Sequence, residues 1–295
     1  MFRRDILSWW LRPAFLRSWG RKKETLFAGP WVGEFGWELI NWQGFVRKLS
    51  RSYRKTVVCC PEGHEALYAD FAAEIHPHRL RGTADCNALR KIQNPEEAER
   101  IHGLVPLDCD WLKPLGYQPF SRQEFIRFGA RQPRSSGAVD VLFHPRGRIF
   151  GADRNWSPER WQALLALFRQ EGYRVGCLGL RDATLKVEGD FLDLRDRPLS
   201  ETLDIIASAK VVVGPSSGPM HLASLCGTPH VVWTDDRSYA RGRSNRDKYE
   251  SWWNPLKTPV RVLDADGFDP PPEIVFESVK KLLEPLDATV NPSEG

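Results

Sequence analysis

The segment from Lys210 to Trp233 restricts the possible folds of this chain more than any other segment. Residues Val211 to Val213 are apolar and β-branched, which is typical of a strand buried on both faces. A turn rich in Gly, Pro and Ser follows, and the apolar pattern after it predicts a helix that ends at Gly227. Residues His230 to Trp233 form the next predicted strand. This order of strand, turn, helix and strand predicts a βαβ unit in a parallel sheet.

The turn before this helix is a candidate site for a diphosphate. The first N–H groups of a helix lack partners within the helix, and the helix dipole favours negative charge beside them. We expect Ser216 or Ser217 to cap the helix and Pro219 to occupy its first turn. Doubly wound domains also contain such turns without a phosphate, so both interpretations stay open on spacing alone. The residues of this candidate site are Ser216, Ser217, Gly218, Pro219, Met220 and His221.

Predicted strands and helices alternate along the rest of the chain, which implies parallel sheets joined by right-handed crossovers. In the first half, we expect strands over Thr25–Val32 and Thr56–Cys60 and helices over Ile40–Leu49 and His64–Phe71. In the second half, we expect strands over Val139–His144 and Tyr173–Leu180 and helices over Pro158–Glu171, Leu199–Ala209 and Glu273–Leu283.

A polar segment rich in turn-forming residues, Gly129–Ala138, separates the two halves and is the expected linker. A chain of 295 residues is long enough for two α/β domains. We therefore predict an α/β fold with two Rossmann-like domains facing across a cleft. The predicted parts are a basic tryptophan-rich segment over residues 1–23, an N-terminal Rossmann-like domain over 24–130 and a C-terminal Rossmann-like domain over 138–285, which contains the candidate diphosphate site.

The composition argues against several kinds of site. The net charge of +4 is small and no DNA- or RNA-binding motif is visible, so we expect no nucleic-acid partner. The cysteines show no C-x-x-C spacing and lie partly in apolar runs, which favours reduced thiols over disulfides or a zinc site. We accordingly expect no bound metal. The cysteines are Cys59, Cys60, Cys86, Cys109, Cys177 and Cys226.

The first 23 residues combine cationic and aromatic side chains. They contain no long uncharged apolar run, so we predict neither a transmembrane span nor a signal peptide. We expect a cytoplasmic protein in which this segment either lies in the headgroup region of an anionic membrane or packs its aromatic side chains on protein. The residues are Arg3, Arg4, Arg12, Arg17, Arg21, Lys22 and Lys23 with Trp9, Trp10, Phe15 and Trp19.

Three stretches, Glu38–Leu49, Phe143–Trp161 and Ser216–Pro229, together resemble one known family. The third stretch, SSGPMHLASLCGTP, resembles the sugar-nucleotide-binding motif of the ADP-heptose:lipopolysaccharide heptosyltransferases, glycosyltransferase family 9. The second is similar to the family's segment in which a basic residue precedes W-P-x-x-x-W. The resemblance implies the two-domain GT-B fold.

The resemblance also suggests a catalytic acidic residue. Glu38 stands at the position of the family's proposed catalytic acid, although Glu replaces Asp and Trp37 separates it from Gly36. Glu34 directly follows a glycine and is the second candidate. The alternative is that Glu38 only caps or solvates the first helix, and both roles stay open at this point.

Basic residues near the second stretch are candidates for holding the diphosphate. Arg154 stands where the family usually has Lys, and Arg146 and Arg148 lie at the same strand end. A guanidinium group binds two phosphate oxygens in a planar fork, which suits a diphosphate. We expect Trp156 and Trp161, the markers of this stretch, to pack against the body of the domain.

The family commonly has an acidic residue where Ser216 stands, and that residue helps to hold the sugar nucleotide. The Ser216 hydroxyl can form a hydrogen bond but brings no charge. His221 is expected either to contact phosphate or ribose or to be a buried core histidine.

The resemblance implies an inverting, metal-independent glycosyltransferase. It would use a nucleotide-diphosphate sugar as co-substrate, with no cofactor, and a glycan or glycolipid as acceptor. A carboxylate would take the acceptor's proton, and arginine and helix N–H groups would stabilise the departing diphosphate. Two alternatives are an enzyme similar to a polysaccharide pyruvyltransferase and a catalytically inactive subunit that binds sugar nucleotides.

Overall fold

The computed structural model of the chain describes residues 15–16, 22–85, 88–114, 117–130, 138–149, 151–236 and 244–284. The chain divides into two compact units. The N-terminal unit ends at Phe128 and also contains Pro198–Ser200, and the C-terminal unit contains the rest of the chain from Gly129. The predicted N-terminal segment over 1–23 and the predicted linker lie mostly outside the described residues.

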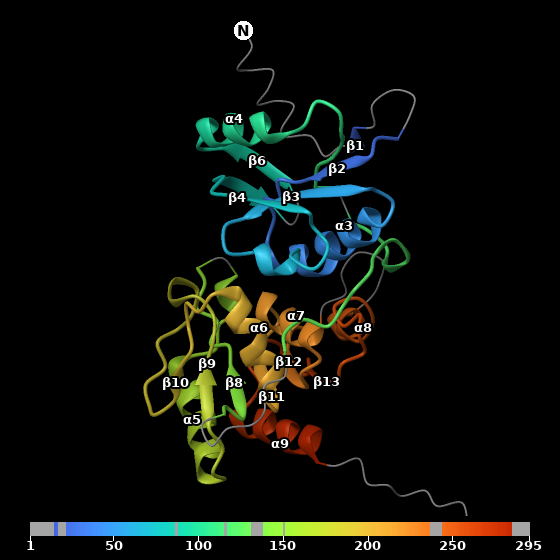
Figure 1. Ribbon diagram of the computed structural model, residues 1–295. Helices are drawn as coiled ribbons and strands as arrows, with labels where there is room; N and C mark the ends of the chain where they lie inside the picture. Colours follow the sequence, from blue (N-terminus) through green and yellow to red (C-terminus); the bar gives the residue numbers. More distant parts are fainter. Residues whose placement is uncertain are drawn as a thin grey trace, which may run out of the picture. The chain divides into compact units, whose positions relative to one another are not determined.

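The N-terminal unit is built on a five-stranded sheet with the strand order β1-β7-β2-β3-β4 (Figure 1). The edge strand β1 pairs antiparallel with β7, and all other neighbours are parallel. The chain adds β3 and β4 on one side of β2 and returns to add β7 on the other side, so the strand order reverses between β2 and β7. The strands are β1 (Phe15–Leu16), β2 (Thr25–Ala28), β3 (Lys55–Pro61), β4 (Glu74–His78) and β7 (Asp110–Leu112).

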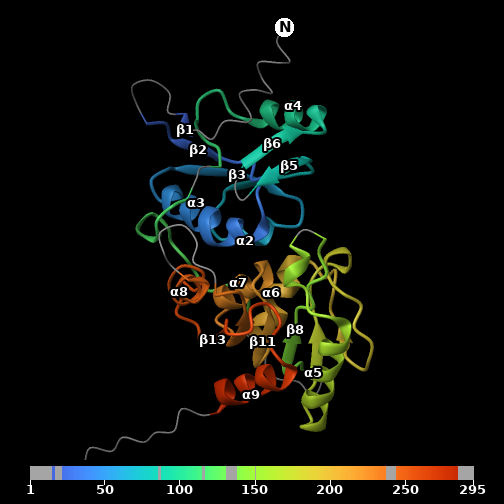
Figure 2. The same ribbon diagram turned by 180° about the vertical axis from the view of Figure 1, so that it is seen from behind.

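One helical segment follows β2 and starts at Phe35, earlier than the predicted start at Ile40. It consists of α2 (Phe35–Trp37), the π-helix η1 (Glu38–Trp42) and α3 (Gln43–Ser50). This segment and α4 (Pro95–Leu104) lie on opposite faces of the sheet (Figure 2). The core on the α4 side contains Phe27, Val57, Cys59, Ala98, Ile101 and Trp111.

The helix predicted over His64–Phe71 is wrong. Only the single 3-10 turn η2 (Glu65–Leu67) forms there. The Ala73 N–H already donates to the Thr56 carbonyl of β3, and β4 begins at the next residue, so the chain must return to the sheet after one turn. The remaining elements of this unit are the antiparallel pair β5 (Gly82–Asp85) and β6 (Ala88–Ile92) and the 3-10 turn η3 (Phe120–Arg122).

The C-terminal unit contains a six-stranded sheet with the strand order β10-β9-β8-β11-β12-β13. All of its neighbouring strands are parallel. The chain adds β9 and β10 on one side of β8 and then adds β11, β12 and β13 on the other, so the order reverses between β8 and β11. The strands are β8 (Val141–Phe143), β9 (Val175–Cys177), β10 (Leu192–Asp193), β11 (Val211–Pro215), β12 (His230–Trp233) and β13 (Val260–Leu263).

The helices predicted in the second half of the chain are confirmed. Their observed bounds are α5 (Pro158–Gln170), α6 (Leu199–Ser208), α7 (Gly218–Cys226) and α9 (Pro272–Leu283), and the structure adds α8 (Asn245–Ser251). Ser157 caps α5 by accepting a hydrogen bond from the Arg160 N–H. The strands β8 and β9 are shorter than predicted, and two 3-10 turns, η4 (Ala152–Arg154) and η5 (Arg181–Ala183), follow them.

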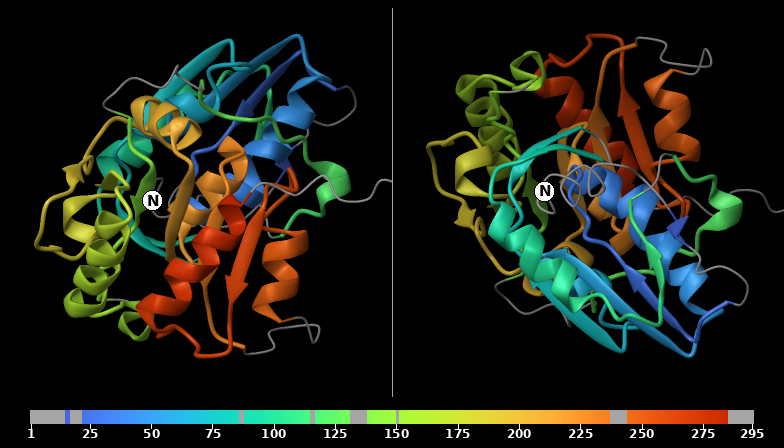
Figure 3. Two further views of the ribbon diagram at one scale, coloured as in Figure 1. Left: turned by 90° about the horizontal axis from the view of Figure 1, so that it is seen from below. Right: turned by 90° about the horizontal axis from the view of Figure 1, so that it is seen from above.

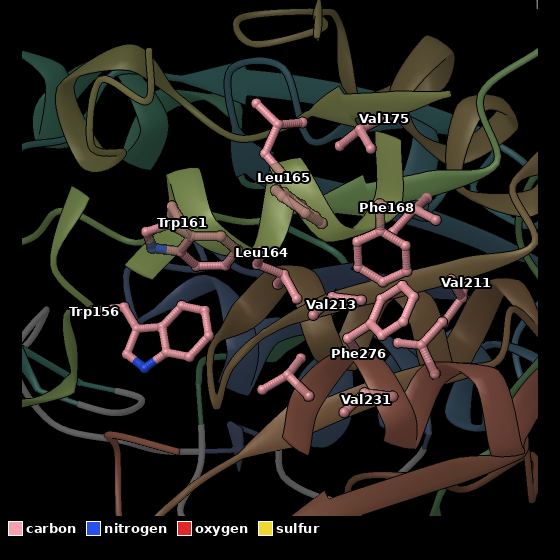
Figure 4. Packing of buried hydrophobic residues seen from close by; sticks show 14 of the residues in the cluster. Trp156, Trp161, Leu164, Leu165, Phe168, Val175, Val211, Val213, Val231 and Phe276 are labelled. Atoms are coloured by element: carbon pink, nitrogen blue, oxygen red, sulfur yellow. The ribbon is translucent and has the colours of Figure 1, made fainter. Parts of the chain in front are cut away.

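The core of the C-terminal unit is rich in aromatic side chains, several of which are seen in Figure 4. Trp156 and Trp161 are both buried, and their indole rings lie 4.6 and 5.5 Å from that of Trp233. This confirms the prediction that both residues pack in the domain. Helices α5 and α9 lie side by side (Figure 3), with the rings of Phe168 and Phe276 5.0 Å apart.

Candidate active site

The strand ends at the reversal point of the C-terminal sheet bring two predicted loops together. In parallel α/β sheets, ligands bind beyond the carboxyl ends of the strands, where the strand order reverses. In this unit, β8 and β11 are the strands on either side of that point. Arg146 follows the end of β8 and Ser216 follows the end of β11. The structure therefore places both predicted loops at the position that the topology favours for a ligand.

Helix α7 begins at this edge, but its predicted cap is wrong. Ser217 occupies the N-cap position, yet its hydroxyl donates to the Pro215 carbonyl, 2.9 Å away, and does not accept from the helix. Ser216 does not cap the helix either, because its hydroxyl accepts from Tyr249. Pro219 occupies the first turn as predicted. The first turn of α7 thus has no side-chain cap, which suits an anion there.

Tyr249 of α8 lies beside Ser216 at this edge of the sheet, and the sequence did not identify it as a site residue. Its buried hydroxyl donates to Ser216 Oγ at 3.2 Å. Burial raises the pKa of Tyr249, while the Ser216 hydroxyl, the Ser217 N–H and the positive charge of Arg154 act in the opposite direction.

The three predicted arginines have different surroundings. Arg146 is buried and donates through Nη1 to the Gly151 carbonyl at 2.7 Å and to Asn155 Oδ1, so it braces its own loop. Arg148 is exposed. Arg154 is half-buried, and its guanidinium packs against Gly151, whose φ of +66° leaves no room for a side chain. Among the described residues, the Arg154 guanidinium forms no hydrogen bond or ion pair and lies 6.0 Å from the centre of the Phe268 ring, so its charge is available to a ligand.

The side chains of Met220 and His221, the last two residues of the predicted diphosphate site, are buried. Met220 is fully buried. His221 is 8% exposed, and its ring is stacked on Tyr249 at 5.3 Å and lies 5.1 Å from Trp253. Burial lowers the pKa of His221 to about 3, and nearby His230 adds to the effect. His221 is therefore a neutral, largely buried histidine and brings no positive charge to a phosphate.

The sequence also did not predict a cluster of polar side chains just beyond the end of β12. Asn245 Nδ2 donates to Thr234 Oγ1 at 2.9 Å and to Asp235 Oδ1 at 2.5 Å. Lys248 lies on the same helix as Asn245, and burial lowers its pKa while Asp235 raises it. The signal in the sequence was an acidic residue two positions after a predicted buried strand. This cluster places a carboxylate just beyond the end of β12, and the Ser216 N–H donates to the Trp233 carbonyl at that strand end.

The N-terminal unit places its two candidate acids in different environments. Glu34 is exposed and occupies the N-cap position of α2 without forming a side-chain cap. Glu38 is fully buried in η1. Its Oε1 accepts from the Tyr68 hydroxyl at 2.6 Å, and its Oε2 lies 2.6 Å from His64 Nδ1. Both residues lie at the carboxyl edge of the sheet, but only Glu34 is open to solvent.

His64 and Tyr68 lie in the turn that replaces the predicted helix. Burial lowers the pKa of His64, but the charge of Glu38 and its hydrogen bond outweigh this effect, so the pKa of His64 is raised overall. Burial and the same carboxylate raise the pKa of Tyr68. The sequence contained a weak signal for this site, a histidine shortly after a predicted strand.

Metal, thiol and membrane features can be assessed only over the described residues. Within those ranges, no group of three or more His, Cys, Asp or Glu side chains could hold a metal ion. Cys59, Cys60, Cys109, Cys177 and Cys226 are free thiols. None of the described helices is long and apolar enough to cross a membrane.

Comparisons with known proteins show which fold this is. No protein-family model matches the sequence, and no curated protein matches it. Among solved structures, E. coli ADP-heptose LPS heptosyltransferase II matches with a TM-score of 0.54 at 16% identity, over 88% of this chain and 98% of that chain. A glycosyl transferase family 9 protein from Veillonella parvula DSM 2008 matches with a TM-score of 0.56 at 12% identity, over 90% and 99%. The chain therefore has the α/β GT-B fold of these glycosyltransferases.

Proposed function

We propose that this protein is an inverting glycosyltransferase. It transfers a sugar from a nucleotide-diphosphate donor to a hydroxyl group of a cell-surface glycan or glycolipid. The observation that carries the proposal is the arrangement at the reversal point of the C-terminal sheet, where the loop with Arg154 and the uncapped first turn of α7, beside the Ser216–Tyr249 pair, follow the ends of two adjacent strands. The GT-B fold and the resemblance of three sequence stretches to family 9 support the same conclusion.

The proposed donor site supplies positive charge without a metal. The diphosphate would accept hydrogen bonds from the Gly218 N–H at the start of α7 and from Arg154, which stabilise the negative charge that develops as the nucleoside diphosphate leaves. Ser216 and Ser217 would contribute their polar groups beside it. Arg146 has a supporting role in this scheme, because its hydrogen bonds hold the loop that carries Arg154. Activity should accordingly persist in the presence of EDTA.

The Ser216 position affects the choice of sugar donor. Ser216 brings no charge, but Asp235, just after the neighbouring strand β12, brings a carboxylate to the same edge of the sheet. Carboxylates accept hydrogen bonds from sugar and ribose hydroxyls. We propose that Asp235 provides this contact to the nucleotide sugar.

The function is tested by binding and turnover with defined probes. The protein is screened by thermal shift against ADP, UDP and GDP, and then incubated with ADP-heptose, UDP-glucose and GDP-mannose while release of nucleoside diphosphate is measured. Stabilisation by one diphosphate and slow hydrolysis of the matching sugar nucleotide are expected. Binding without any turnover would favour an inactive sugar-nucleotide-binding subunit. The absence of both binding and turnover would remove this function, and an enzyme similar to a pyruvyltransferase would then be the next hypothesis to test.

A further inference from the structure

The structure bears on which group activates the acceptor. Glu38 has no exposed surface, and its two oxygens already face Tyr68 and His64. A general base must come within hydrogen-bond distance of the proton that it removes. In this arrangement, a substrate hydroxyl meets neither oxygen of the Glu38 carboxylate.

The side chain of His64, in contrast to that of Glu38, is accessible to a substrate. Its side chain is 27% exposed, whereas that of Glu38 is 0% exposed. Because a carboxylate only accepts hydrogen bonds, its contact with Nδ1 places the imidazole proton on that nitrogen and leaves a lone pair on Nε2. Over the described residues, His64 forms no other side-chain hydrogen bond, so Nε2 is available to a substrate.

His64 is also held in one orientation. Its ring contacts the edge of Phe35 with centroids 5.0 Å apart, and its backbone N–H donates to the Pro61 carbonyl at 3.0 Å. Pro61 is the last residue of β3, so His64 lies at the carboxyl edge of the N-terminal sheet, together with Glu34. Ligands bind at this edge in parallel α/β sheets.

We propose that His64 is the general base of the transfer reaction and that Glu38 is a positioning residue that acts through it. The inference rests on the proposed function. The acceptor hydroxyl gives its proton to His64 Nε2 while its oxygen forms a bond to the anomeric carbon. The bond between that carbon and the diphosphate oxygen breaks, and the electron pair leaves with the nucleoside diphosphate. Glu38 stabilises the resulting imidazolium, which releases the proton to water.

The charges around His64 suit this role. Glu38 on η1 and Glu65 on η2 both favour the protonated imidazole, and Tyr68 donates to the far oxygen of Glu38. The charge of His64 also reaches His78 on β4, and burial lowers the pKa of His78 to about 4, which keeps it neutral. The buried thiol of Cys60 on β3 is neutral as well, because burial and Glu38 raise its pKa.

The decisive experiment compares three variants in the hydrolysis assay with the best sugar nucleotide of the panel. In H64N, the amide can still donate to Glu38, but no base remains at the Nε2 position. Turnover should fall by about 10²–10⁴-fold, the usual contribution of a general base, while affinity for the nucleoside diphosphate is unchanged. H76N is the matched control, because His76 is a partly exposed histidine of β4 that contacts Glu74. It should retain wild-type turnover.

The pH dependence separates His64 from Glu38. His64 must be neutral to act, so wild-type turnover should fall as pH decreases through its raised pKa. In E38Q the neighbouring negative charge is gone, the pKa of His64 falls, and the acidic limb should move to lower pH. H64N should lose this limb. Near-normal turnover in H64N, beside a fall of about 10²–10⁴-fold in E38Q, would assign the base to Glu38 and overturn the proposal.

A measurement that needs no substrate distinguishes the inference from the proposed function. NMR of the imidazole nitrogens in the full-length protein should show a proton on His64 Nδ1 and a pKa above the ordinary value, which E38Q lowers. A titration without these features would contradict the His64–Glu38 pair even if the enzyme is active. A wild-type protein that shows these features but does not turn over any sugar nucleotide would instead overturn the proposed function and, with it, the role of His64.

Discussion

Arg154 is the residue on which binding of the diphosphate should depend most. Its guanidinium forms no hydrogen bond within the described residues, so a ligand phosphate would not have to displace a protein partner. Arg154→Ala should weaken nucleoside-diphosphate binding by roughly 1.5–3 kcal/mol, the range for a charge-assisted hydrogen bond. Isothermal titration calorimetry measures this loss. Arg169→Ala is the control, because Arg169 on α5 is exposed and pairs with Asp190. Equal affinities of the two variants would remove Arg154 from the site.

Glu34 allows a second test at the level of single residues. It is exposed at the carboxyl edge of the N-terminal sheet and lies one helical turn before Glu38. If it orients the acceptor, Glu34→Gln should raise the KM for the acceptor with a smaller change in kcat. A fall in kcat comparable to that of H64N would instead make Glu34 the base. Steady-state kinetics with varied acceptor concentration separates these outcomes.

At the scale of elements, the stability of α7 depends on Gly227, the glycine at its C-terminal end. Gly227 has φ 71° and ψ 25°, the left-handed conformation that suits glycine at the end of a helix. Gly227→Ala should lower the free energy of unfolding by roughly 1–2 kcal/mol, because a Cβ disfavours this conformation. Gly103→Ala provides the contrast. It lies in α4, where an added Cβ meets no atom within 4 Å, and should stabilise the protein by about 0.5–1 kcal/mol. Urea denaturation measures both effects.

The N-terminal segment over residues 1–23 remains a prediction, because almost all of it lies outside the described residues. Its arginines and tryptophans should bind anionic vesicles by electrostatic attraction and interfacial burial, and the binding should weaken as salt concentration rises. Co-sedimentation with vesicles that contain phosphatidylglycerol measures this. A chain that starts at Glu24 should remain in the supernatant. Equal sedimentation of the shortened and intact chains would show that the segment does not mediate membrane binding.

At the scale of the whole molecule, the nucleotide should bind to the C-terminal unit alone. Both loops of the proposed donor site, Arg146–Arg154 and Ser216–His221, belong to that unit, which has its own six-stranded sheet and aromatic core. A chain that starts near Gly137 should therefore retain measurable affinity for a nucleoside diphosphate. Circular dichroism first checks that it is folded. If the folded unit does not bind while the intact chain does, the site has been placed wrongly.

The sequence by itself determined the alternation of strands and helices. The buried strands β11 and β12, the helices α5, α7 and α9, and the packing of Trp156 and Trp161 follow from apolar patterns and caps. These signals are local, because each depends on residues within a few turns of the chain. The same kind of reasoning failed over His64–Phe71, where the pairing of Ala73 with β3 left room for only one helical turn.

Only the tertiary structure decided which polar side chains meet. It paired Glu38 with His64 and Tyr68, which lie 26 and 30 residues further along the chain, and Ser216 with Tyr249, 33 residues further. It also distinguished Arg146, whose guanidinium holds its own loop by hydrogen bonds, from Arg154, whose guanidinium forms no hydrogen bond within the described part of the chain. The physical reason is that parallel strands align their carboxyl ends at one edge of a sheet. Residues that are distant in sequence become neighbours there, and no local periodicity records which of them will touch.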